Sequence, residues 1–403
     1  MPGPNTRIVT TPVSDIPDLA FRSPSPEVFS WLKDGHGLIA WGEYASVRLN
    51  GTEALHAGEA WFADQTADLE LDDQVRRPGT GALAFVSGAF DPDRATTSFV
   101  IPSHILGRDE FGSWMTTIGD TASPHAIPPR VEIDGPGPIT YGDGNLDAAD
   151  WMEAVAEAVR RIKAGRLDKV VLARDIMAIA EQPIDPRFLI QQLTSAYHSC
   201  WTYSVHGLVG ATPELLLRLA AGHVYSRVLA GTEWGEGAYE RVQSPKNREE
   251  HAYAARSAAA ALEKVTIRLD VPGEPKVLTL PNVVHLATEI RGDVADGIGA
   301  CQVAAAMHPT AAVGGTPTDL AVATITELEG LNRGRYAGPV GWIDSAGNGE
   351  FGIALRGGQL RDDHTMQLIA GCGIVADSNP ATELAESMSK LVVMRDALEP
   401  SSN

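Results

Sequence analysis

Apolar and polar positions alternate with a helical period in several parts of this chain. The clearest example covers residues 147–164, and its apolar stripe consists of Trp151, Val155, Val159 and Ile162. Acidic side chains stand at the start of this segment and basic ones at its end, which suits the dipole of a helix. The pattern therefore predicts a helix that buries one face.

Other segments carry helical signals of the same kind. They cover residues 187–199, 246–269, 300–307 and 318–331. A closing helix is expected to begin after Asn379 and Pro380, because Asn is a good N-cap and Pro suits the first helical position. These helices fall in blocks that are separated by stretches of a different pattern.

Those stretches have the pattern of strands. Residues 167–180 are apolar almost throughout, and residues 366–375 form an apolar run broken by Gly371 and Gly373. Shorter alternating segments cover residues 37–50, 82–90, 96–108, 202–232, 277–294 and 336–360, and Asn50-Gly51 is a hairpin signal. Strands joined mostly by hairpins, with helices in separate blocks, predict an α+β protein with largely antiparallel sheets.

Composition divides the chain into three parts. Residues 1–26 are rich in Pro, Ser and Thr and are expected to form a flexible leader. Residues 27–145 are β-rich and end in a Pro/Gly-rich stretch, 124–143, that predicts a linker. Residues 146–399 hold almost all the groups that could carry chemistry.

Net charge and cysteine usage limit the function. The chain has 52 acidic and 32 basic side chains, a formal net charge of −20, which disfavours binding to nucleic acid or to an anionic membrane. Its three cysteines, Cys200, Cys301 and Cys372, are far apart and form no CxxC pair, which favours a reducing compartment. With no signal-peptide core and no apolar run near about 20 residues, we expect a cytoplasmic protein.

Two charged residues stand next to or inside apolar runs. Lys169 is one, and burial would favour its neutral form, so that it could act as a general base; alternatively, its amine reaches solvent. Glu214 precedes an apolar strand, where a raised carboxyl pKa would suit a general acid. Its alternative is a solvent-facing strand start.

Paired acids start two of the predicted helices. Glu383 and Glu386 lie three residues apart, on one face of the closing helix, and Lys390 follows one turn later. Glu249 and Glu250 begin another helix, and one carboxylate from each helix could share a Mg²⁺ ion. The alternative for both pairs is an acidic helix start that only compensates the dipole.

Several motifs together resemble those of the chorismate-utilising enzymes, and within them those of isochorismate synthases. In chain order they read LDKVVLAR, ATPELLLRL, VLAGT, KNREEH, HPTAAVGGTPT, RYAGPVGW, FGIALR and IAGCGIVADS…ELAESMSK. The resemblance covers about residue 150 to the C-terminus, with only a loose match before it through GLIAWGE. It implies a central antiparallel β-sandwich flanked by helices, a Mg²⁺-dependent site between the sheets, chorismate as substrate and a monomeric chain.

The resemblance also implies a role for each motif residue. Lys169 would activate water to attack C2 of chorismate, and Glu214 would protonate the departing C4 hydroxyl, giving isochorismate. Magnesium would be held by Glu250 and Glu386, with Glu383 in support. The remaining residues would bind the substrate: Gly231, Thr232, Tyr336, Arg356, Gly371, Gly373 and Lys390.

Single positions distinguish the members of this superfamily. Lys169 stands where the amine-transferring members resemble each other in having Gln, and Ala230 replaces a lysine of the aminodeoxychorismate synthases. At position 312 the chain has Ala and resembles the isochorismate synthases. Salicylate synthases, which also eliminate pyruvate, have Thr at this position. Tyr336 and Leu355 fit both, so salicylate synthase stays open as the alternative.

The sequence departs from the family pattern at one position, and it leaves two questions open. Asn247 stands where relatives often have an acid, which lowers the negative charge near the expected metal. A binding homologue without catalysis is a further alternative, against which the joint presence of Lys169, Glu214, Glu250 and Glu386 argues. The product could serve menaquinone, siderophore or salicylate synthesis.

Overall fold

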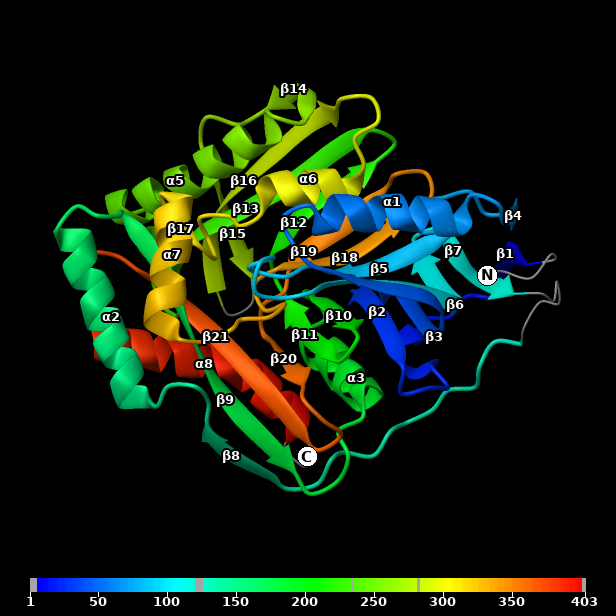
Figure 1. Ribbon diagram of the computed structural model, residues 1–403, viewed down its shortest axis with the longest axis horizontal. Coiled ribbons are helices and arrows are strands. Elements are labelled where there is room, and N and C mark those ends of the chain that lie inside the picture. The colour runs from blue at the N-terminus through cyan, green and yellow to red at the C-terminus, as the bar shows by residue number, and fades with distance from the viewer. Residues whose placement is uncertain (1–5, 120–125, 234, 281–282, 401–403) are drawn as a thin grey trace.

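A computed structural model describes residues 6–119, 126–233, 235–280 and 283–400 of the chain, and the side chains of Thr232, Lys246, Glu250, Leu280 and Val283 lie outside this description. The described strands are connected by pairing into one large sheet that folds over on itself (Figure 1). All of these pairs are antiparallel except β1 (Arg7–Val13) with β4 (Glu70–Asp73). The α+β class with antiparallel sheets predicted from the sequence is confirmed.

Strand β6 (Thr97–Asp109) is the junction of the sheet. One edge of β6 pairs along its length with β3 (His36–Leu49). Its other edge is divided, because β5 (Leu83–Ser87) pairs with its first residues and β7 (Gly112–Gly119) pairs with its last ones. β7 continues to β1 and β4. Two arms of the sheet therefore leave β6 from opposite edges.

The first arm starts at β3 and ends at two long strands, β21 (Thr365–Ile374) and β9 (Lys169–Ala180). The strands that connect β3 to β21 are, in the order in which they pair, β2 (Val28–Lys33), β10 (Trp201–Val205), β11 (Leu208–Thr212) and β20 (Gly357–Leu360). At the far edge β9 also pairs with β8 (Ile139–Asp143) and with the short β17 (Gly315–Thr316).

The second arm starts at β5 and ends at β13 (His223–Glu233) and β16 (Val283–Val294). The strands that connect β5 to β13 are, in the order in which they pair, β18 (Pro339–Asp344), β19 (Gly349–Ile353) and β12 (Leu215–Ala220). The outer edge of β16 pairs with β14 (Thr266–Asp270) and β15 (Lys276–Leu280).

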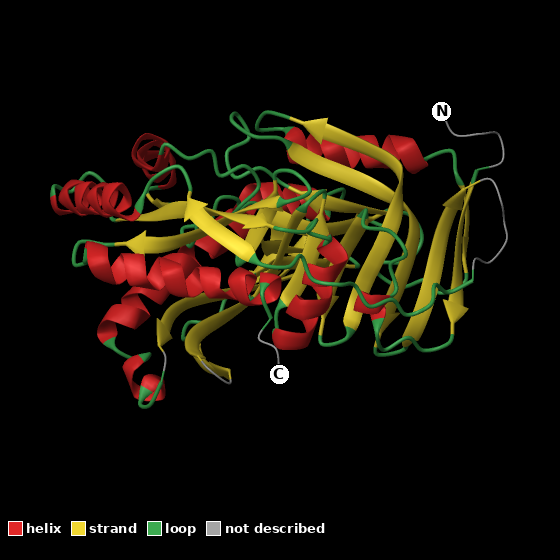
Figure 2. Cartoon of the chain, turned by 90° about the horizontal axis from the view of Figure 1, so that it is seen from below, coloured by secondary structure: helices red, strands yellow, loops and turns green. Residues whose placement is uncertain are grey.

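The two arms face each other across an aromatic core, which makes a sandwich (Figure 2). The core takes side chains from both arms, among them Phe29, Trp31 and Trp201 from the first and Phe85 and Trp342 from the second. A buried carboxylate links the arms, because Glu350 of β19 accepts hydrogen bonds from the indoles of Trp31 (2.8 Å) and Trp201 (2.6 Å). This polar link satisfies two indole N–H groups that burial would otherwise leave unpaired.

Helices surround this sandwich (Figures 1 and 2). Those described are the short 3₁₀ helix η1 (Leu19–Phe21), α1 (Ala54–Thr66), α2 (Ala148–Lys163), α3 (Pro186–Ala196), α4 (Ala238–Arg241), α5 (Pro245–Leu262), α6 (Ala300–Met307), α7 (Thr318–Glu329) and α8 (Pro380–Leu398). The sequence signals that begin α2 and α8 are confirmed. The Asp147 side chain accepts from the backbone of Ala149 and Asp150, and Asn379 caps α8 in the same way.

A buried ion pair fixes the start of β9 against the segments around it. Glu329 and Arg333 have side chains that are 1% and 2% exposed, and each guanidinium nitrogen has a partner. Arg333 donates to the carbonyl oxygens of Val171 (2.8 Å) and Val313 (2.9 Å), while Glu329 accepts from the backbone N–H of Ala173 (2.6 Å). Strand β9, the end of α7 and the loop at Val313 are thus held in one arrangement.

The prediction of a flexible leader over residues 1–26 is wrong for residues 7–26. Residues Arg7–Val13 form β1, whose partner strands β7 and β4 lie far along the chain. Ile16 and Leu19 are buried, because η1 and the chain before it cover one face of the first arm. Ile8 is buried in a different core cluster, together with side chains of α1. Residues 1–5 lie outside the described part.

Other local predictions also need correction. No hairpin forms at Asn50-Gly51; the chain enters α1 instead. This helix has only a weak apolar stripe, because Gly58 lies on its buried face between Leu55 and Phe62. A Cβ atom at Gly58 would lie 2.0 Å from the Phe99 ring. The helix predicted over 246–269 ends at Leu262, and β-branched Thr266 begins β14.

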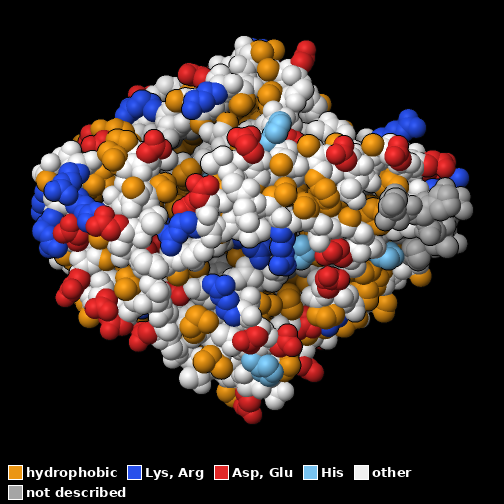
Figure 3. All heavy atoms as spheres, in the orientation of Figure 1, with side chains coloured by type: hydrophobic (Ala, Val, Ile, Leu, Met, Phe, Trp, Pro, Cys, Tyr) orange, Lys and Arg blue, Asp and Glu red, His pale blue; other side chains and the backbone are white. Residues whose placement is uncertain are grey.

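The predicted linker over 124–143 ends early, because residues Ile139–Asp143 form β8 at the edge of β9. None of the helices in the described ranges combines the length and apolar character that crossing a membrane requires. Acidic side chains are spread over the face shown in Figure 3, with basic ones between them.

We expect Arg333→Met to lower the free energy of unfolding by about 3–5 kcal/mol, because it leaves the Glu329 carboxylate buried without its partner. Urea unfolding followed by circular dichroism measures the change. Arg160→Ala serves as the control, since it removes an exposed ion pair with Glu157 (2.8 Å) and should change the same quantity by less than about 1 kcal/mol. Equal effects of the two substitutions would contradict this role of the buried pair.

Candidate active site

A cavity of about 1030 Å³ lies between the far ends of the two arms, where β9 and β21 of the first approach β13 of the second. Helices α5 and α8 and the loop before β17 complete its walls. Most of the residues singled out from the sequence line it: Lys169, Glu214, Gly231, Tyr336, Arg356, Gly371, Gly373, Glu383, Glu386 and Lys390. The side chains of Thr232 and Glu250 lie outside the description, and their backbones belong to β13 and α5.

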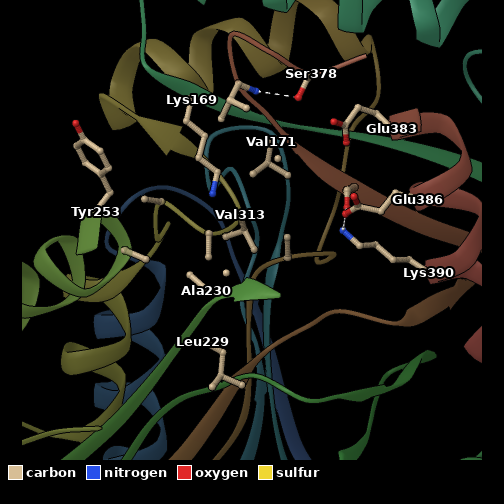
Figure 4. A pocket seen from close by; sticks show the side chains of 18 of the residues that line it. Lys169, Val171, Leu229, Ala230, Tyr253, Val313, Ser378, Glu383, Glu386 and Lys390 are labelled. Carbon is tan, nitrogen blue, oxygen red and sulfur yellow. Dashed lines mark hydrogen bonds and ion pairs between the residues drawn. The ribbon is translucent and has the colours of Figure 1, made fainter. Parts of the chain in front are cut away.

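Lys169 is the first residue of β9 and points into the cavity (Figure 4). It stands opposite Thr316 of β17 in the strand register, two residues before the Val171 carbonyl that Arg333 holds. The aliphatic part of the side chain passes over Gly373, where a Cβ atom would lie 3.0 Å from the lysine Cε. A bare glycine at this position therefore makes room for the lysine.

Glu214 lies in the turn between β11 and β12 and lines the same cavity. Its backbone is fixed at both ends, since the N–H donates to the Thr212 hydroxyl (3.2 Å) and the carbonyl accepts from Ile353 (3.1 Å). Burial raises the pKa of the Glu214 carboxyl to about 7, against the lowering effect of the positive charges of Lys169, Arg356 and Lys390. The alternative of a solvent-facing strand start is wrong.

Arg356 occupies strained backbone, with φ at +51°, in the segment between β19 and β20. Its carbonyl accepts a hydrogen bond from Ala211 (3.2 Å), and burial lowers the pKa of its guanidinium. Tyr336 lies close enough to interact with it electrostatically, and burial raises the pKa of this phenol to about 12. Left-handed backbone at a non-glycine residue costs roughly 1–3 kcal/mol and is concentrated at functional sites.

The opposite side of the cavity carries the carboxylates of α8 (Figure 4). Ligand atoms of Cys372, Glu383 and Glu386 lie within 4.8 Å of one another. The Cys372 thiol donates to the Glu383 carbonyl (3.3 Å), and burial raises the pKa of this thiol to about 12, which keeps it neutral. Two carboxylates beside a protonated thiol form an oxygen donor set, which suits Mg²⁺ better than zinc.

Lys390 also belongs to this side, but its charge is engaged by the protein. Its ammonium forms an ion pair with Glu386 (2.7 Å) and donates to the Gly371 carbonyl (2.8 Å). The lysine therefore holds α8 against β21 and orients one of the two carboxylates. Its contribution of positive charge to the cavity is partly cancelled by Glu386.

Sequence reasoning missed one residue of the cavity wall. His285 lines the cavity, and burial lowers the pKa of its imidazole to about 4, so the ring is neutral at pH 7. It faces Thr232 across the β13–β16 ladder, a neighbour that local pattern cannot show. His308 lies at the end of α6, with its Nε2 within hydrogen-bond distance of the Phe90 carbonyl (3.0 Å).

The cavity combines an amine, a carboxyl group that titrates near neutrality, a guanidinium and a pair of carboxylates suited to a hard cation. This arrangement is typical of an enzyme that carries out acid–base chemistry on a small anionic substrate. A comparison with known families is more specific. The model described as "Chorismate binding enzyme" matches residues 136–399, and the chain belongs to this family.

The relatives in this family include isochorismate synthases. The chain is 37% identical to the salicylate biosynthesis isochorismate synthase of Pseudomonas aeruginosa over 67% of its own length, and it spans 59% of that relative. It is 32% identical to the putative isochorismate synthase MenF of Mycobacterium tuberculosis, with 82% of this chain and 90% of the relative covered. The structure of the menaquinone-specific isochorismate synthase MenF from Escherichia coli has the same fold, with 22% identity, a TM-score of 0.80 and coverage of 99% of this chain and 95% of that one.

We expect the Glu214 carboxyl to titrate near pH 7, above the ordinary range of a glutamate. Carbon-13 labelling of glutamate side chains and NMR titration measure it, with the signal assigned by its loss in Glu214→Gln. Lys169→Met should move the midpoint upward, because it removes a positive charge that favours the ionised form. A midpoint near 4.5, or no shift in the Lys169 variant, would contradict this environment.

Proposed function

We propose that this chain is an isochorismate synthase that interconverts chorismate and isochorismate. Water adds at C2 of the ring and the C4 hydroxyl leaves. The observation that carries the proposal is that Glu214, Lys169 and Arg356 line one cavity, where burial raises the pKa of the Glu214 carboxyl to about 7. Family membership and the names of the relatives support the choice of substrate.

Two residues move the protons in this proposal. Lys169 accepts a proton from the attacking water, and the bare Gly373 beneath its side chain lets the amine reach into the cavity. Glu214 donates its proton to the departing hydroxyl, for which a carboxyl titrating near neutrality is suited at cellular pH. The double bonds of the ring shift as the hydroxyl leaves, so the reaction consumes one water and releases another.

The anionic groups of the substrate need separate partners. Arg356 can hold the enolpyruvyl carboxylate through a bidentate contact, and the Tyr336 phenol, kept protonated by its raised pKa, can donate to the same group. Glu383 and Glu386, with Glu250 of α5, would hold Mg²⁺, which neutralises the ring carboxylate when bound. Gly231, Thr232, Gly371 and Gly373 would complete the substrate site with their backbone.

Ala312 bears on the alternative of a salicylate synthase, which goes on to eliminate pyruvate. It lines the cavity beside Val313, at the loop that Arg333 holds. A methyl group there offers no hydroxyl for a second step, which favours release of isochorismate. The monomeric state and the cytoplasmic location stay predictions.

Product analysis tests the proposed reaction. Purified protein is incubated with chorismate, with and without Mg²⁺, and the products are separated by chromatography with mass detection. We expect an isomer of the same mass as chorismate, formed only with Mg²⁺ and without pyruvate. Lys169→Ala and Glu214→Gln should lower its rate by about 10²–10⁴-fold, because each removes one proton transfer.

The other outcomes are also informative. Salicylate and pyruvate in equal amounts would establish the salicylate synthase alternative and show that Ala312 does not prevent elimination. Binding of chorismate without conversion in either condition would contradict both enzymes and favour a binding homologue. Unimpaired turnover in a variant would remove that residue from its proposed role.

A further inference from the structure

Three polar residues join the start of α5 to β13 at the edge of the cavity, and we call them the Asn247 network. Asn247 is 8% exposed, and its side-chain amide donates to the Glu233 carboxylate (3.1 Å) and to the Arg241 carbonyl (2.9 Å). The other Glu233 oxygen accepts from the Arg241 Nε (3.1 Å). The network therefore connects the last residue of β13, the short helix α4 and the first turn of α5.

The backbone of Asn247 is held by close contacts, as its side chain is. The Asn247 N–H donates to the Ser244 hydroxyl (3.3 Å), which caps α5. Gly231 has φ at +70°, and a Cβ atom there would lie 3.0 Å from the Asn247 carbonyl oxygen. Helix α5 thus starts directly on the irregular part of β13, where the register shifts between Ala230 and Thr232.

Charge explains why an amide stands at this position. Glu233 lies with its carboxylate against the Asn247 side chain, so an acid in place of Asn247 would bring two negative groups to about hydrogen-bond distance. The amide instead gives the carboxylate a donor. Because Asn247, Glu233 and Gly231 all line the cavity, any change in their packing alters its wall.

We propose that Asn247 is a positioning residue of the metal side of the active site. It holds the first turn of α5, and with it the backbone of Glu250 one turn later, at a fixed distance from Gly231 and Thr232. The inference rests on the proposed function, because it takes Glu250 as a magnesium ligand and Gly231–Thr232 as part of the substrate site. Asn247 itself contacts neither, and it acts through the placement of the helix.

Four variants separate positioning from charge. Asn247→Ala removes both hydrogen bonds without adding charge, and Asn247→Asp also places a carboxylate against Glu233. The double variant Glu233→Gln/Asn247→Asp exchanges donor and acceptor, so that the pair keeps its total charge and the hydrogen bond between its two side chains, while the bond to the Arg241 carbonyl stays broken. Gln243→Glu is the matched control, because it adds a negative charge to the same segment at a residue outside the cavity.

Binding of Mn²⁺ as a probe for Mg²⁺, followed by loss of the free-ion EPR signal, gives a readout that needs no turnover. We expect Asn247→Ala and Asn247→Asp to weaken Mn²⁺ binding about tenfold, since each breaks the hydrogen bonds that place the helix. The exchanged double variant should bind Mn²⁺ more tightly than Asn247→Asp, because it restores the hydrogen bond between the two side chains, and Gln243→Glu should bind like the wild type. The Mg²⁺ concentration for half-maximal turnover should move in parallel, while the far-UV circular dichroism at the assay temperature stays that of the wild type.

Several results would overturn the positioning role. Wild-type binding in both single variants, tighter binding in Asn247→Asp, or no rescue by the exchanged pair would each do so. Single variants that are partly unfolded at the assay temperature would reduce the network to a structural one. If the wild type binds Mn²⁺ and the variants behave as expected but chorismate is not converted, the proposed reaction fails while the positioning of the metal side stands.

Discussion

The buried ion pair between Glu329 and Arg333 is the interaction on which one wall of the cavity depends. Arg333 ties the Val171 carbonyl of β9 to the Val313 carbonyl of the neighbouring loop, and Glu329 binds the Ala173 N–H. Burying two charges costs hydration, and such a pair contributes less to stability than to a single geometry when all its hydrogen bonds are made. Because Lys169 lies two residues before Val171, this geometry sets where its amine enters the cavity.

The electrostatics of the cavity differ from those of the whole chain. The protein carries a net charge of −20, yet Lys169, Arg356 and Lys390 lie around one concave site, which also holds the carboxylates of Glu383 and Glu386. Burial raises the pKa of Glu214, and the three positive charges lower it, with a result near 7. Positive side chains can thus face an anionic substrate locally inside a strongly acidic protein.

Local patterns in the sequence predicted the elements whose signals are also local. The stripe of α2, the apolar run of β9 and the Asn379 cap of α8 each depend on neighbours within a few residues, and all three are confirmed. Strand β1 could not be predicted in this way, because its partners β7 and β4 lie far along the chain. Helix α1 was missed because close packing at Gly58 leaves it only a weak apolar stripe.

The same distinction holds for the site. Motif resemblance selected the residues that line the cavity, while their environment came only from the fold. The raised pKa of Glu214 reflects burial by distant strands, and His285 reaches the cavity only through the β13–β16 register. The contact of Asn247 with Glu233 joins residues fourteen apart through a turn that no local pattern specifies.

In the proposed reaction a water molecule, and not the departing hydroxyl of the substrate, supplies the new oxygen at C2. Incubation of the wild-type protein with chorismate in H₂¹⁸O, stopped at low conversion and followed by mass spectrometry, tests this source of the oxygen directly. We expect each isochorismate formed to carry one ¹⁸O atom, located on C2. Isochorismate without label would show that the hydroxyl moves within the substrate, and it would contradict the roles proposed for Lys169 and Glu214.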